Sequence, residues 1–493
     1  MPETTKSLSD LGLRARDGRE TRITGLSVDS RTVKPGHLFA ALAGAKMHGA
    51  EFIPYALRMK AGAVLTDPAG AEMAREVLTG TDIPVIVVED ARAALAGAAA
   101  LWFGAQPQVM VAVTGTNGKT SVATFTRQIW TRLGHLAANI GTTGVEGAFV
   151  APATHTTPEP LTLHRLLAEM AAEGITHAAM EASSHGLEQR RLDGVRLRAA
   201  GFTNFTQDHL DYHHDFDAYF AAKAGLFTRV LPDDGSAVVN MDDPKGVEIA
   251  RLCHDRGLPV LGVGRGSVDL RITAQRFDAT GQELRFDWQG KPRQVRLNLI
   301  GGFQADNVLL AAGLAIASGS KAERVFEALP ALSTVRGRMQ LVATRANGAS
   351  VFVDYAHTPD AVATALRALR PHVLGRIIVV LGAGGDRDKA KRPLMGEAAH
   401  RYADVVYVTD DNPRSEDPAV IRAAVKGGAP EANEVGDRAE AILRAVDALQ
   451  PGDALLIAGK GHETGQTIGD QSYPFDDAEQ ASIAVAALDG KRI

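Results

Sequence analysis

The segment Thr114-Gly-Thr-Asn-Gly-Lys-Thr120 combines the residue types that bind the phosphates of a nucleotide. It follows a short apolar run, Val109–Val113, and precedes a helix-like run, Ser121–Leu133. Glycines let backbone N–H groups close on phosphate oxygens, and a helix N-terminus adds a favourable dipole. A lysine neutralises phosphate charge, and a threonine hydroxyl suits Mg²⁺. The usual pattern has glycine where Val113 stands, so this is a shortened nucleotide loop. Its expected contacts are Thr114, Gly115, Thr116, Asn117, Gly118, Lys119 and Thr120.

Polar side chains also follow two other strand-like runs. Glu181 ends the run Thr176–Glu181, and His209 lies shortly after the run Ala199–Asn204. These two side chains and Thr120 could share one hard cation, with water and phosphate completing an octahedron. Histidines in loops often serve only as polar caps, so spacing alone leaves both interpretations open.

Lys223 lies in an apolar helical context. Its neighbours three and four residues away are Tyr219, Phe220, Leu226 and Phe227. A lysine on such a face either extends its amine to water along an apolar stem or enters a site. Burial in a site would favour the neutral amine.

The shortened loop resembles that of the Mur ligases and the folylpolyglutamate synthetases, which are ATP-driven amide-forming enzymes. Two further segments, Met180–Leu187 and Asn204–His213, resemble Mur ligase motifs whose Glu and His hold Mg²⁺ with the loop threonine. The stretch around Lys223 resembles the one in which the lysine is carbamylated by CO₂ and binds a second Mg²⁺. The resemblance therefore implies a metal site of Thr120, Glu181, His209 and carbamylated Lys223, and catalytic roles for Lys119, Lys223, His209 and Arg338.

Three more segments resemble the remaining ATP contacts of that family. They are Gly301–Asn307, Arg336–Arg338 and Val353–Asp360. The resemblance implies that ATP is held between the second and third domains, whose closure would exclude water. The matched positions are Asn307, Arg338, Asp354 and His357.

The first segments of the chain resemble the uridine-diphosphate pocket of the Mur ligases that add the third residue of the peptidoglycan peptide. The matching runs are Val28–Arg31 and Gly36–Ala40. Isolated Ser and Thr residues would otherwise be interpreted as helix caps. The resemblance implies that UDP-N-acetylmuramoyl-L-alanyl-D-glutamate binds Val28, Ser30, Thr156, Thr157, Ser183, Gln189 and Arg191.

The last third of the chain carries Asp410–Asp417, Ala458–Glu463 and Gly384–Lys389. Taken without the resemblance, the run Asp-Asn-Pro-Arg is typical of a turn. In the family it marks ligases that add meso-diaminopimelate, whereas lysine-adding relatives lack the arginine. A guanidinium can bind the second carboxylate of diaminopimelate through two hydrogen bonds. The implied pocket is Arg387, Asp411, Asn412, Pro413, Arg414, Gly459 and Glu463.

These residues need a scaffold of alternating strands and helices. Buried strand-like runs alternate with helical ones, which predicts an α/β protein with mostly parallel, doubly wound sheets. Between Val268 and Leu299 apolar and polar residues tend to alternate with a period of two, which predicts antiparallel hairpins. At about 150 residues per domain, the 493 residues predict roughly three domains. We place them at 1–107 (UDP-substrate), 108–335 (P-loop ATPase with the β insertion) and 336–493 (Rossmann-like, amino-acid binding).

Composition narrows the class of protein further. The 45% apolar and 23% charged residues are ordinary for a globular protein. A net charge of −5 argues against nucleic-acid or anionic-membrane partners. A single cysteine, Cys253, excludes a disulfide framework. No run approaches the ~18 apolar residues of a membrane helix, and the first residues lack a secretory signal. We expect a monomeric, cytoplasmic protein, and the resemblance to the Mur ligases implies an enzyme of cell-wall peptidoglycan synthesis.

The resemblance implies an ATP-dependent ligase that joins meso-diaminopimelate to the D-glutamyl side carboxylate through an acyl phosphate, releasing ADP and phosphate. Two alternatives stay open. One is a lysine-adding ligase of the same family, and the other is a P-loop ATPase or binding protein without ligase activity. The identity of the general base also stays open, since His209 would be occupied if it binds metal.

Overall fold

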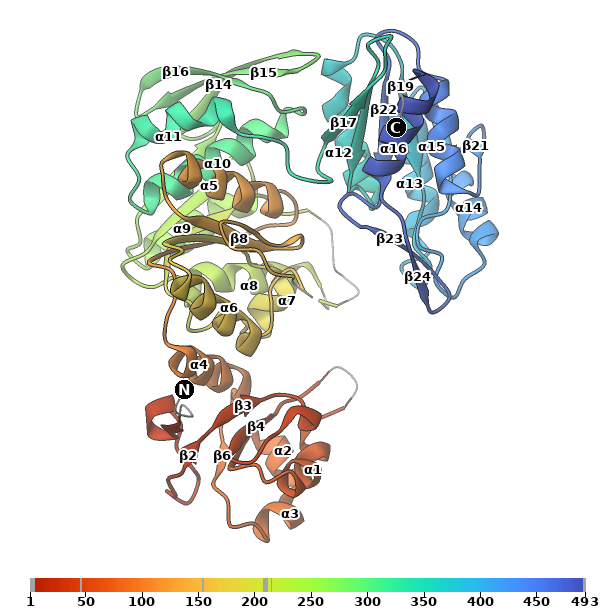
Figure 1. Cartoon of the computed structure of the whole chain (residues 1–493). Coiled ribbons are helices and arrows are strands. Elements are labelled where there is room, and N and C mark those ends of the chain that lie inside the picture. The colour runs from red at the N-terminus through yellow and green to blue at the C-terminus, as the bar shows by residue number, and fades with distance from the viewer. Residues whose placement is uncertain (1–4, 45–46, 153–154, 207–211, 214, 491–493) are drawn as a thin grey trace. The chain divides into compact units, whose positions relative to one another are not determined.

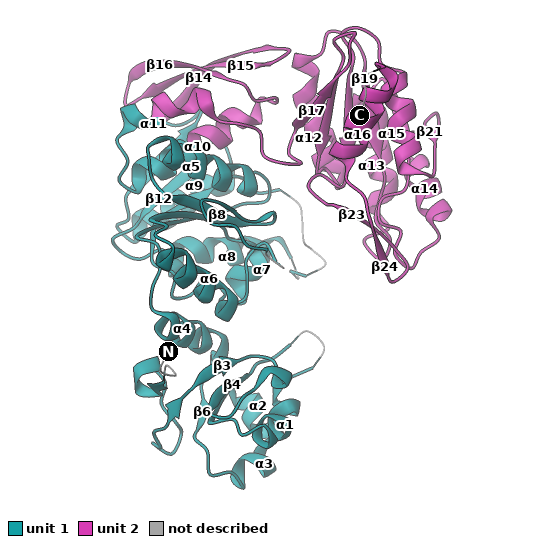
Figure 2. Cartoon of the chain, in the orientation of Figure 1, with its two compact units in different colours: residues 1–267, 310–325 teal, residues 268–309, 326–493 magenta. Residues whose placement is uncertain are grey.

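The computed structural model describes residues 5–44, 47–152, 155–206, 212–213 and 215–490. The chain forms two compact units (Figure 2). Unit 1 comprises residues 1–267 and 310–325, and unit 2 comprises residues 268–309 and 326–493. Among the described residues, no helix has the length and apolarity needed to cross a membrane.

Unit 1 begins with a small parallel sheet in the order β3-β4-β5-β6 (Figure 1). Its strands are β3 (Gly25–Ser27), β4 (His37–Ala41), β5 (Ala63–Thr66) and β6 (Val85–Val87), preceded by the short pair β1 (Lys6–Ser7) and β2 (Arg22–Ile23). Its helices are α1 (Ile53–Arg58), α2 (Pro68–Met73), α3 (Arg75–Thr79) and α4 (Ala91–Phe103). Asp67 and Asp90 cap α2 and α4 by accepting hydrogen bonds from backbone N–H groups of their first turns.

The larger sheet of unit 1 has β7 near its centre, in the order β13-β12-β11-β7-β10-β8-β9. All neighbours are parallel except the terminal pair β8 and β9. The strands are β7 (Val109–Thr114), β8 (Ala137–Gly141), β9 (Gly144–Gly147), β10 (His177–Glu181), β11 (Leu197–Phe202), β12 (Ser236–Asn240) and β13 (Val260–Gly264). The parallel arrangement brings the carboxyl ends of β7, β10 and β11 to one edge, where open α/β sheets bind ligands.

Helices cover this sheet because its strands are apolar on both faces. The helices are α5 (Lys119–Arg132), α6 (Pro160–Ala172), α7 (Ser184–Glu188), α8 (Phe216–Gly225), a π-helical turn (Leu226–Val230) and α9 (Pro244–Asp255). Leu163 of α6, Phe220 of α8 and Ile249 of α9 pack in one core with Met110 and Ala112 of β7. Cys253 of α9 belongs to the same core, and its burial raises the pKa of the thiol to about 11.

Unit 2 contains the antiparallel strands predicted from the period of two. They are β14 (Leu270–Asp278), β15 (Gly281–Trp288) and β16 (Lys291–Leu297), paired in that order. Helices α10 (Phe303–Ala317) and α11 (Ala322–Ala328) follow, and the division between the units passes through both of them. Within unit 2, His372 accepts a hydrogen bond from Gly301 N (3.0 Å) and bonds Asp278 O through its other ring nitrogen (2.7 Å). These bonds attach the antiparallel strands to the rest of unit 2.

The second sheet of unit 2 has the order β17-β18-β22-β19-β20-β21, and only β17 is antiparallel to its neighbour. Its strands are β17 (Gln340–Thr344), β18 (Ser350–Asp354), β19 (Ile377–Leu381), β20 (Val405–Val408), β21 (Asn433–Glu434) and β22 (Ala454–Ala458); the hairpin β23 (Gly465–Ile468) and β24 (Gln471–Pro474) follows. The helices are α12 (Pro359–Leu369), α13 (Lys391–Tyr402), α14 (Pro418–Lys426), α15 (Arg438–Asp447) and α16 (Asp477–Leu488).

Alternation along β19 explains why helices lie on both faces of this sheet. Ile377, Val379 and Leu381 pack in a core with residues of α12, α13 and α14. Ile378 and Val380 pack in another core with residues of α15 and α16. A strand that is apolar at every position is buried on both sides, as the sequence predicted. The domain limits predicted at residues 107 and 335 stay predictions.

Candidate active site

The glycine loop joins β7 to α5, as predicted, and α5 begins at Lys119. Gly118 adopts a left-handed conformation with φ of 87°, which turns the chain into the helix. Gly115 has φ of 144°, and an added Cβ there would lie 1.8 Å from the Thr203 hydroxyl oxygen. A side chain at position 115 would therefore displace the loop from β11.

Residues just beyond β11 hold the loop in place. Thr116 N donates to Asn204 O (2.8 Å), and Asn117 N donates to Asn204 Oδ1 (2.9 Å). The Thr203 hydroxyl donates to Asn117 O at 2.6 Å. Neither Thr203 nor Asn204 was predicted to have a role from the sequence, although Asn204 begins the segment Asn204–His213 described above. Their position at the end of a strand, where α/β sheets bind ligands, is the sequence feature that could have identified them.

Lys119 lies over the loop that it was predicted to serve. Its Nζ donates to Gly115 O and to Thr116 O, both at 2.9 Å. The ammonium is therefore positioned at the loop, where a lysine can neutralise bound phosphate.

Thr120 and Glu181 are brought together as predicted. The Thr120 hydroxyl lies 3.1 Å from Glu181 Oε2, and Thr142 N donates to Oε1 at 2.9 Å. Hydroxyl and carboxylate oxygens are the donors that hard cations prefer. His209 lies outside the described residues, so its place in this set stays a prediction. Within the described ranges, no group of three or more His, Cys, Asp and Glu side chains could hold a metal ion.

Lys223 is buried at the glycine loop. Its side chain is 1% exposed, and Nζ donates to Gly115 O at 2.7 Å. The same nitrogen lies 4.5 Å from the ring centroid of Tyr219. A lysine that extends to water cannot be this buried, so that alternative is wrong. A π-helical turn begins three residues later, at Leu226, and such turns are frequent at functional sites.

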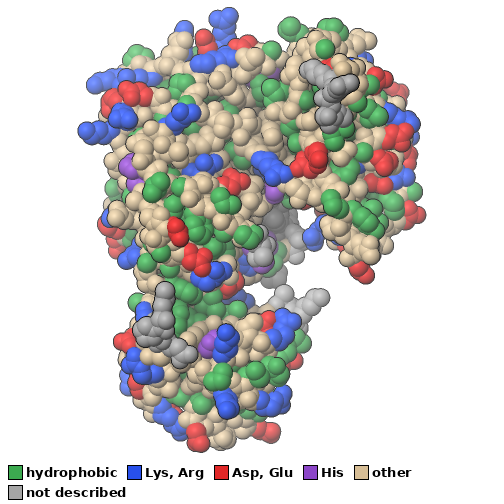
Figure 3. Space-filling model, viewed as in Figure 1, with side chains coloured by type: hydrophobic (Ala, Val, Ile, Leu, Met, Phe, Trp, Pro, Cys, Tyr) green, Lys and Arg blue, Asp and Glu red, His purple; other side chains and the backbone are tan. Residues whose placement is uncertain are grey.

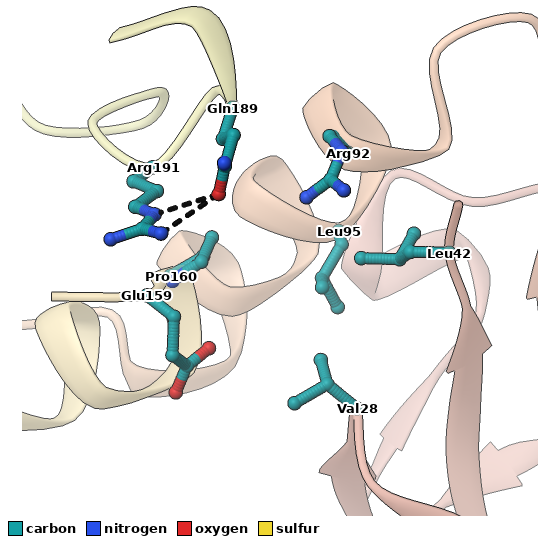
Figure 4. Close-up of a pocket in the computed structure, with 8 residues that line it drawn as sticks. All are labelled: Val28, Leu42, Arg92, Leu95, Glu159, Pro160, Gln189 and Arg191. Carbon is teal, nitrogen blue, oxygen red and sulfur yellow. Dashed lines mark hydrogen bonds between the residues drawn. The ribbon is translucent and has the colours of Figure 1, made fainter. Parts of the chain in front are cut away.

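A cavity of about 160 Å³ lies within unit 1 and contains three residues predicted to bind the UDP substrate (Figure 4). These are Val28, Gln189 and Arg191. The rest of the lining could not be predicted from the sequence, because α4 and α6 meet only in the folded chain. The missed residues are Leu42, Arg92, Leu95, Glu159 and Pro160.

Arg191 is oriented towards this cavity by neutral partners. Its guanidinium donates to Gln189 Oε1 (2.8 Å), as drawn in Figure 4, and to Thr157 O (2.7 Å). Burial, with a smaller contribution from Arg92, lowers the pKa of Arg191. Glu159 uses its carboxylate to cap α6, where it accepts from the N–H groups of Leu161 and Thr162. An anionic substrate group would relieve the repulsion between the two arginines.

The remaining residues predicted for the UDP substrate lie near Glu181 or, in the case of Ser30, between the strands β3 and β4. Thr157 is buried and donates to Glu181 O at 2.9 Å, and the Ser183 hydroxyl lies 3.1 Å from the Thr157 hydroxyl. Ser183 also caps α7, so its cap interpretation is confirmed. Thr156 lies 3.1 Å from Thr142 through their hydroxyl oxygens. Ser30 is buried in a 3₁₀ turn, and it does not line the cavity.

The other ATP candidates, Arg338, Asp354, His357 and Asn307, belong to unit 2. The Arg338 guanidinium lies 4.7 Å from the ring centroid of Tyr355. Asp354 accepts from Met339 N (2.7 Å) and Ala356 N (2.8 Å). Burial raises the pKa of Asp354, while the Arg338 charge opposes that shift. His357 is exposed, and the Asn307 side chain is buried and donates to Gln304 Oε1 at 3.1 Å.

The residues predicted for diaminopimelate form one cluster in unit 2. Arg414 Nη1 donates to Gly385 O (2.7 Å), and Asn412 Nδ2 donates to Glu463 Oε2 (3.0 Å). Arg387 and Arg414 both approach Gly384, since an added Cβ there would lie 3.8 Å from Arg387 Cγ and 2.9 Å from Arg414 Nη1.

Two close contacts complete this cluster. Pro413 O would lie 1.8 Å from a Cβ at Gly385, and Asp411 Oδ2 would lie 2.6 Å from a Cβ at Gly459. Arg414 itself has φ of 51°. Non-glycine residues adopt this conformation at a cost that surrounding contacts must offset, and such residues concentrate at functional sites.

The cluster contains both positive and negative side chains, which favours a substrate that carries both an anionic and a cationic group. Burial and the neighbouring Asp411 raise the pKa of Glu463, while Asn412, Lys460 and Arg414 lower it. The arginines supply positive groups, and Glu463 supplies a carboxylate that can accept from an ammonium. Elsewhere, Lys and Arg side chains lie among Asp and Glu on the face shown in Figure 3, in accord with the net charge of −5.

Comparison with protein families matches most of the chain to three domains of one family. Residues 22–103 match "Mur ligase family, catalytic domain", residues 113–315 match "Mur ligase middle domain", and residues 337–461 match "Mur ligase, glutamate ligase domain". The sequence therefore carries three successive domains of this kind.

Individual proteins are similar over nearly the whole chain. The UDP-N-acetylmuramoyl-L-alanyl-D-glutamate--2,6-diaminopimelate ligase of Bradyrhizobium diazoefficiens is 51% identical over 470 residues, covering 94% of this chain and 95% of that protein. A solved structure with the same enzyme name has a TM-score of 0.72 and 32% identity, covering 98% of this chain and 99% of that chain. A Mycobacterium tuberculosis folylpolyglutamate synthase complexed with ADP has a TM-score of 0.62 at 19% identity, covering 81% of this chain and 94% of that chain, which shows a shared fold.

Proposed function

Because the chain belongs to the Mur ligase family, an ATP-binding family of ligases, we propose a specific reaction for it. The enzyme joins meso-diaminopimelate to the D-glutamyl side carboxylate of UDP-N-acetylmuramoyl-L-alanyl-D-glutamate and converts ATP to ADP and phosphate. This reaction builds the peptidoglycan precursor. We also propose that the enzyme acts as a monomer in the cytoplasm.

The observation that carries the proposal is the cluster of Arg414, Asn412 and Glu463 in unit 2. Diaminopimelate differs from lysine by one carboxylate at the far end of its side chain. A guanidinium held at the pocket can bind that carboxylate through two hydrogen bonds, and Glu463 can accept from an ammonium of the same amino acid. The 51% identical relative that bears the diaminopimelate name supports this assignment.

The nucleotide site supplies the activation step. A carboxylate is a poor acyl donor because its leaving group would be oxide. Phosphorylation of the D-glutamyl carboxylate by ATP gives an acyl phosphate; the amine of diaminopimelate then attacks the carbonyl carbon, and phosphate leaves. We propose that Lys119 and Arg338 stabilise the charge of the transferring phosphoryl group. Asn307, Asp354 and His357 would contact the nucleotide.

The donor set at Thr120 and Glu181 fits Mg²⁺. A hydroxyl oxygen and a carboxylate oxygen 3.1 Å apart are hard ligands that can share one small cation. We propose that they hold Mg²⁺, with His209 as a further ligand. The metal would neutralise phosphate charge, and Lys119 would act beside it from the glycine loop.

We further propose that Lys223 is carbamylated. The ammonium would first lose a proton to give the neutral amine. The amine nitrogen would then form a bond to the carbon of CO₂ and lose a second proton, which converts a buried cation into an anion. The carbamate keeps one N–H, so the hydrogen bond to Gly115 O at 2.7 Å is compatible with the modification. An anion beside the loop could bind a second Mg²⁺, as the family resemblance implies.

The test is an amino-acid panel supplied with ATP and the UDP-linked dipeptide, with products identified by mass. We expect the diaminopimelate adduct and one ADP per bond formed. A lysine adduct in its place would favour the lysine-adding relatives. ATP turnover that needs neither amino acid nor dipeptide would contradict ligase activity.

A further inference from the structure

We propose that Lys460 is a positioning residue for the amino-acid substrate, because it fixes the Asn412 side chain that in turn holds Glu463. This inference rests on the proposed function and adds a residue to its specificity pocket. Lys460 follows β22 and is 0% exposed. Its Nζ donates to Asn412 Oδ1 (2.9 Å) and to Gly465 O (2.8 Å). One buried ammonium thus joins three segments of unit 2.

These contacts determine which way the Asn412 amide faces. Asn412 Oδ1 accepts from Lys460 Nζ and also from Thr467 N, each at 2.9 Å. Lysine has no acceptor, and a backbone N–H has none either. A flipped amide would place its NH₂ group against two donors. Nδ2 is therefore directed to Glu463 Oε2, 3.0 Å away.

The Glu463 carboxylate is held as a result. Its Oε2 accepts from Asn412 and lies 3.8 Å from Lys460 Nζ. Glu463 N also donates to Lys460 O at 3.0 Å. Both the position of the carboxylate and its negative charge therefore depend on Lys460. A substrate ammonium needs both.

Lys460 is one of the cations that oppose protonation of Glu463, together with Arg414 and the buried Arg438. Burial, followed by Asp411, raises the pKa of Glu463, whereas the hydrogen bond from Asn412 and the charges of Lys460 and Arg414 lower it. Burial lowers the pKa of Lys460 itself, and the charges that act on it are those of Asp411, Arg438, Glu463 and Asp477. Removing the Lys460 charge should therefore raise the pKa of Glu463.

Two substitutions separate orientation from charge. Lys460→Met removes the donors and the charge, while Lys460→Gln keeps an NH₂ donor without the charge. We expect Lys460→Met to raise the KM for diaminopimelate about tenfold to a hundredfold, the effect of losing one hydrogen bond to a charged group, with the KM for ATP unchanged. Lys460→Gln should recover part of that loss. In both variants the acid limb of kcat/KM for diaminopimelate should move to higher pH.

A double-mutant cycle tests whether Lys460 acts through Asn412. The effects of Lys460→Gln and Asn412→Ala on kcat/KM for diaminopimelate should be non-additive, because the second change removes the group that the first one positions. Lys426→Met, at a half-buried lysine of α14 paired with Glu434, is the matched control and should leave all KM values unchanged.

The outcomes distinguish this inference from the proposed function. A parent enzyme that forms no diaminopimelate adduct contradicts the proposed function. Adduct formation with parental KM and pH profile in both Lys460 variants overturns the inference alone. Equal rises in KM for diaminopimelate and for ATP would also overturn it, since they indicate a general structural role. Effects that multiply in the cycle would overturn it too, because they would show that Lys460 acts independently of Asn412.

Discussion

The Lys223 side chain donates a hydrogen bond to the carbonyl oxygen of Gly115, 2.7 Å away and 108 residues earlier in the sequence. Gly115 O also accepts from Lys119 Nζ at 2.9 Å. One carbonyl oxygen of the glycine loop thus accepts hydrogen bonds from two lysines, one on α5 and one on α8. The contact places Lys223 where a modification of its amine would change the charge next to bound phosphate.

Lys119 should be essential for turnover. Lys119→Ala removes the charge that we propose stabilises the transferring phosphoryl group, and we expect kcat to fall on the order of a hundredfold or more. Arg132→Ala, at an exposed cation in the last turn of the same helix, is the control and should keep parental kcat. Turnover of Lys119→Ala near that of the parent would argue against the nucleotide assignment. The measurement is ADP release at saturating substrates.

Lys223 should carry a carbamate in the active enzyme. Lys223→Ala should be nearly inactive, and acetate or another short carboxylate should restore part of the activity by replacing the lost anion. Activity at a range of acetate concentrations measures the rescue. Native mass measurement of the parent with ATP and CO₂ should show the added group. A plain amine in that measurement would contradict the prediction.

Arg414 should decide between diaminopimelate and lysine. Arg414→Ala removes one partner of the proposed charge pair with the distal carboxylate, and we expect a loss of about 2–5 kcal/mol. That corresponds to roughly 30-fold to several-thousandfold in kcat/KM for diaminopimelate. Arg414→Lys should recover little, because an ammonium lacks the planar fork of donors.

The comparison for Arg414 is kcat/KM with both amino acids. Arg444→Ala, at an exposed arginine of α15 paired with Glu440, should leave the diaminopimelate-to-lysine ratio unchanged. If Arg414→Ala left that ratio unchanged as well, the pocket would lie elsewhere and the lysine-adding alternative would gain support.

The ion pair of Arg438 and Asp477 should stabilise unit 2. Both side chains are 0% exposed, with Arg438 Nη2 and Asp477 Oδ2 2.7 Å apart. Asp477→Ala leaves a buried guanidinium without its anion, which costs about 3–5 kcal/mol of unfolding free energy. Glu440→Ala breaks the exposed pair of Glu440 and Arg444 on α15, the helix that also carries Arg438. This change should cost less than about 1 kcal/mol of unfolding free energy. Urea unfolding of the full chain should separate the two variants, and equal midpoints would contradict the prediction.

Much of this site could be predicted because its motifs are local. The glycine loop, its strand and its helix are contiguous, so spacing alone indicated them. The strands β8 and β9 were not predicted, since Ala137-Ala-Asn-Ile-Gly141 has few of the β-branched residues that favour strands. Residues whose role depends on distant partners were also missed. Arg92 and Glu159 line one cavity from separate helices, and Lys460 acts on Asn412 only after folding.

The buried position of Cys253 makes the chain suitable for distance measurements with attached fluorophores. Cys253 is the single cysteine, and burial raises the pKa of its thiol to about 11, so it should react slowly with maleimides at neutral pH. Val150 of unit 1 is 78% exposed, and Leu374 of unit 2 is 97% exposed. Cysteines placed at these two positions would accept a donor and an acceptor dye while Cys253 stays unlabelled. Energy transfer between the dyes would then report directly on movement of one unit against the other as each substrate is added.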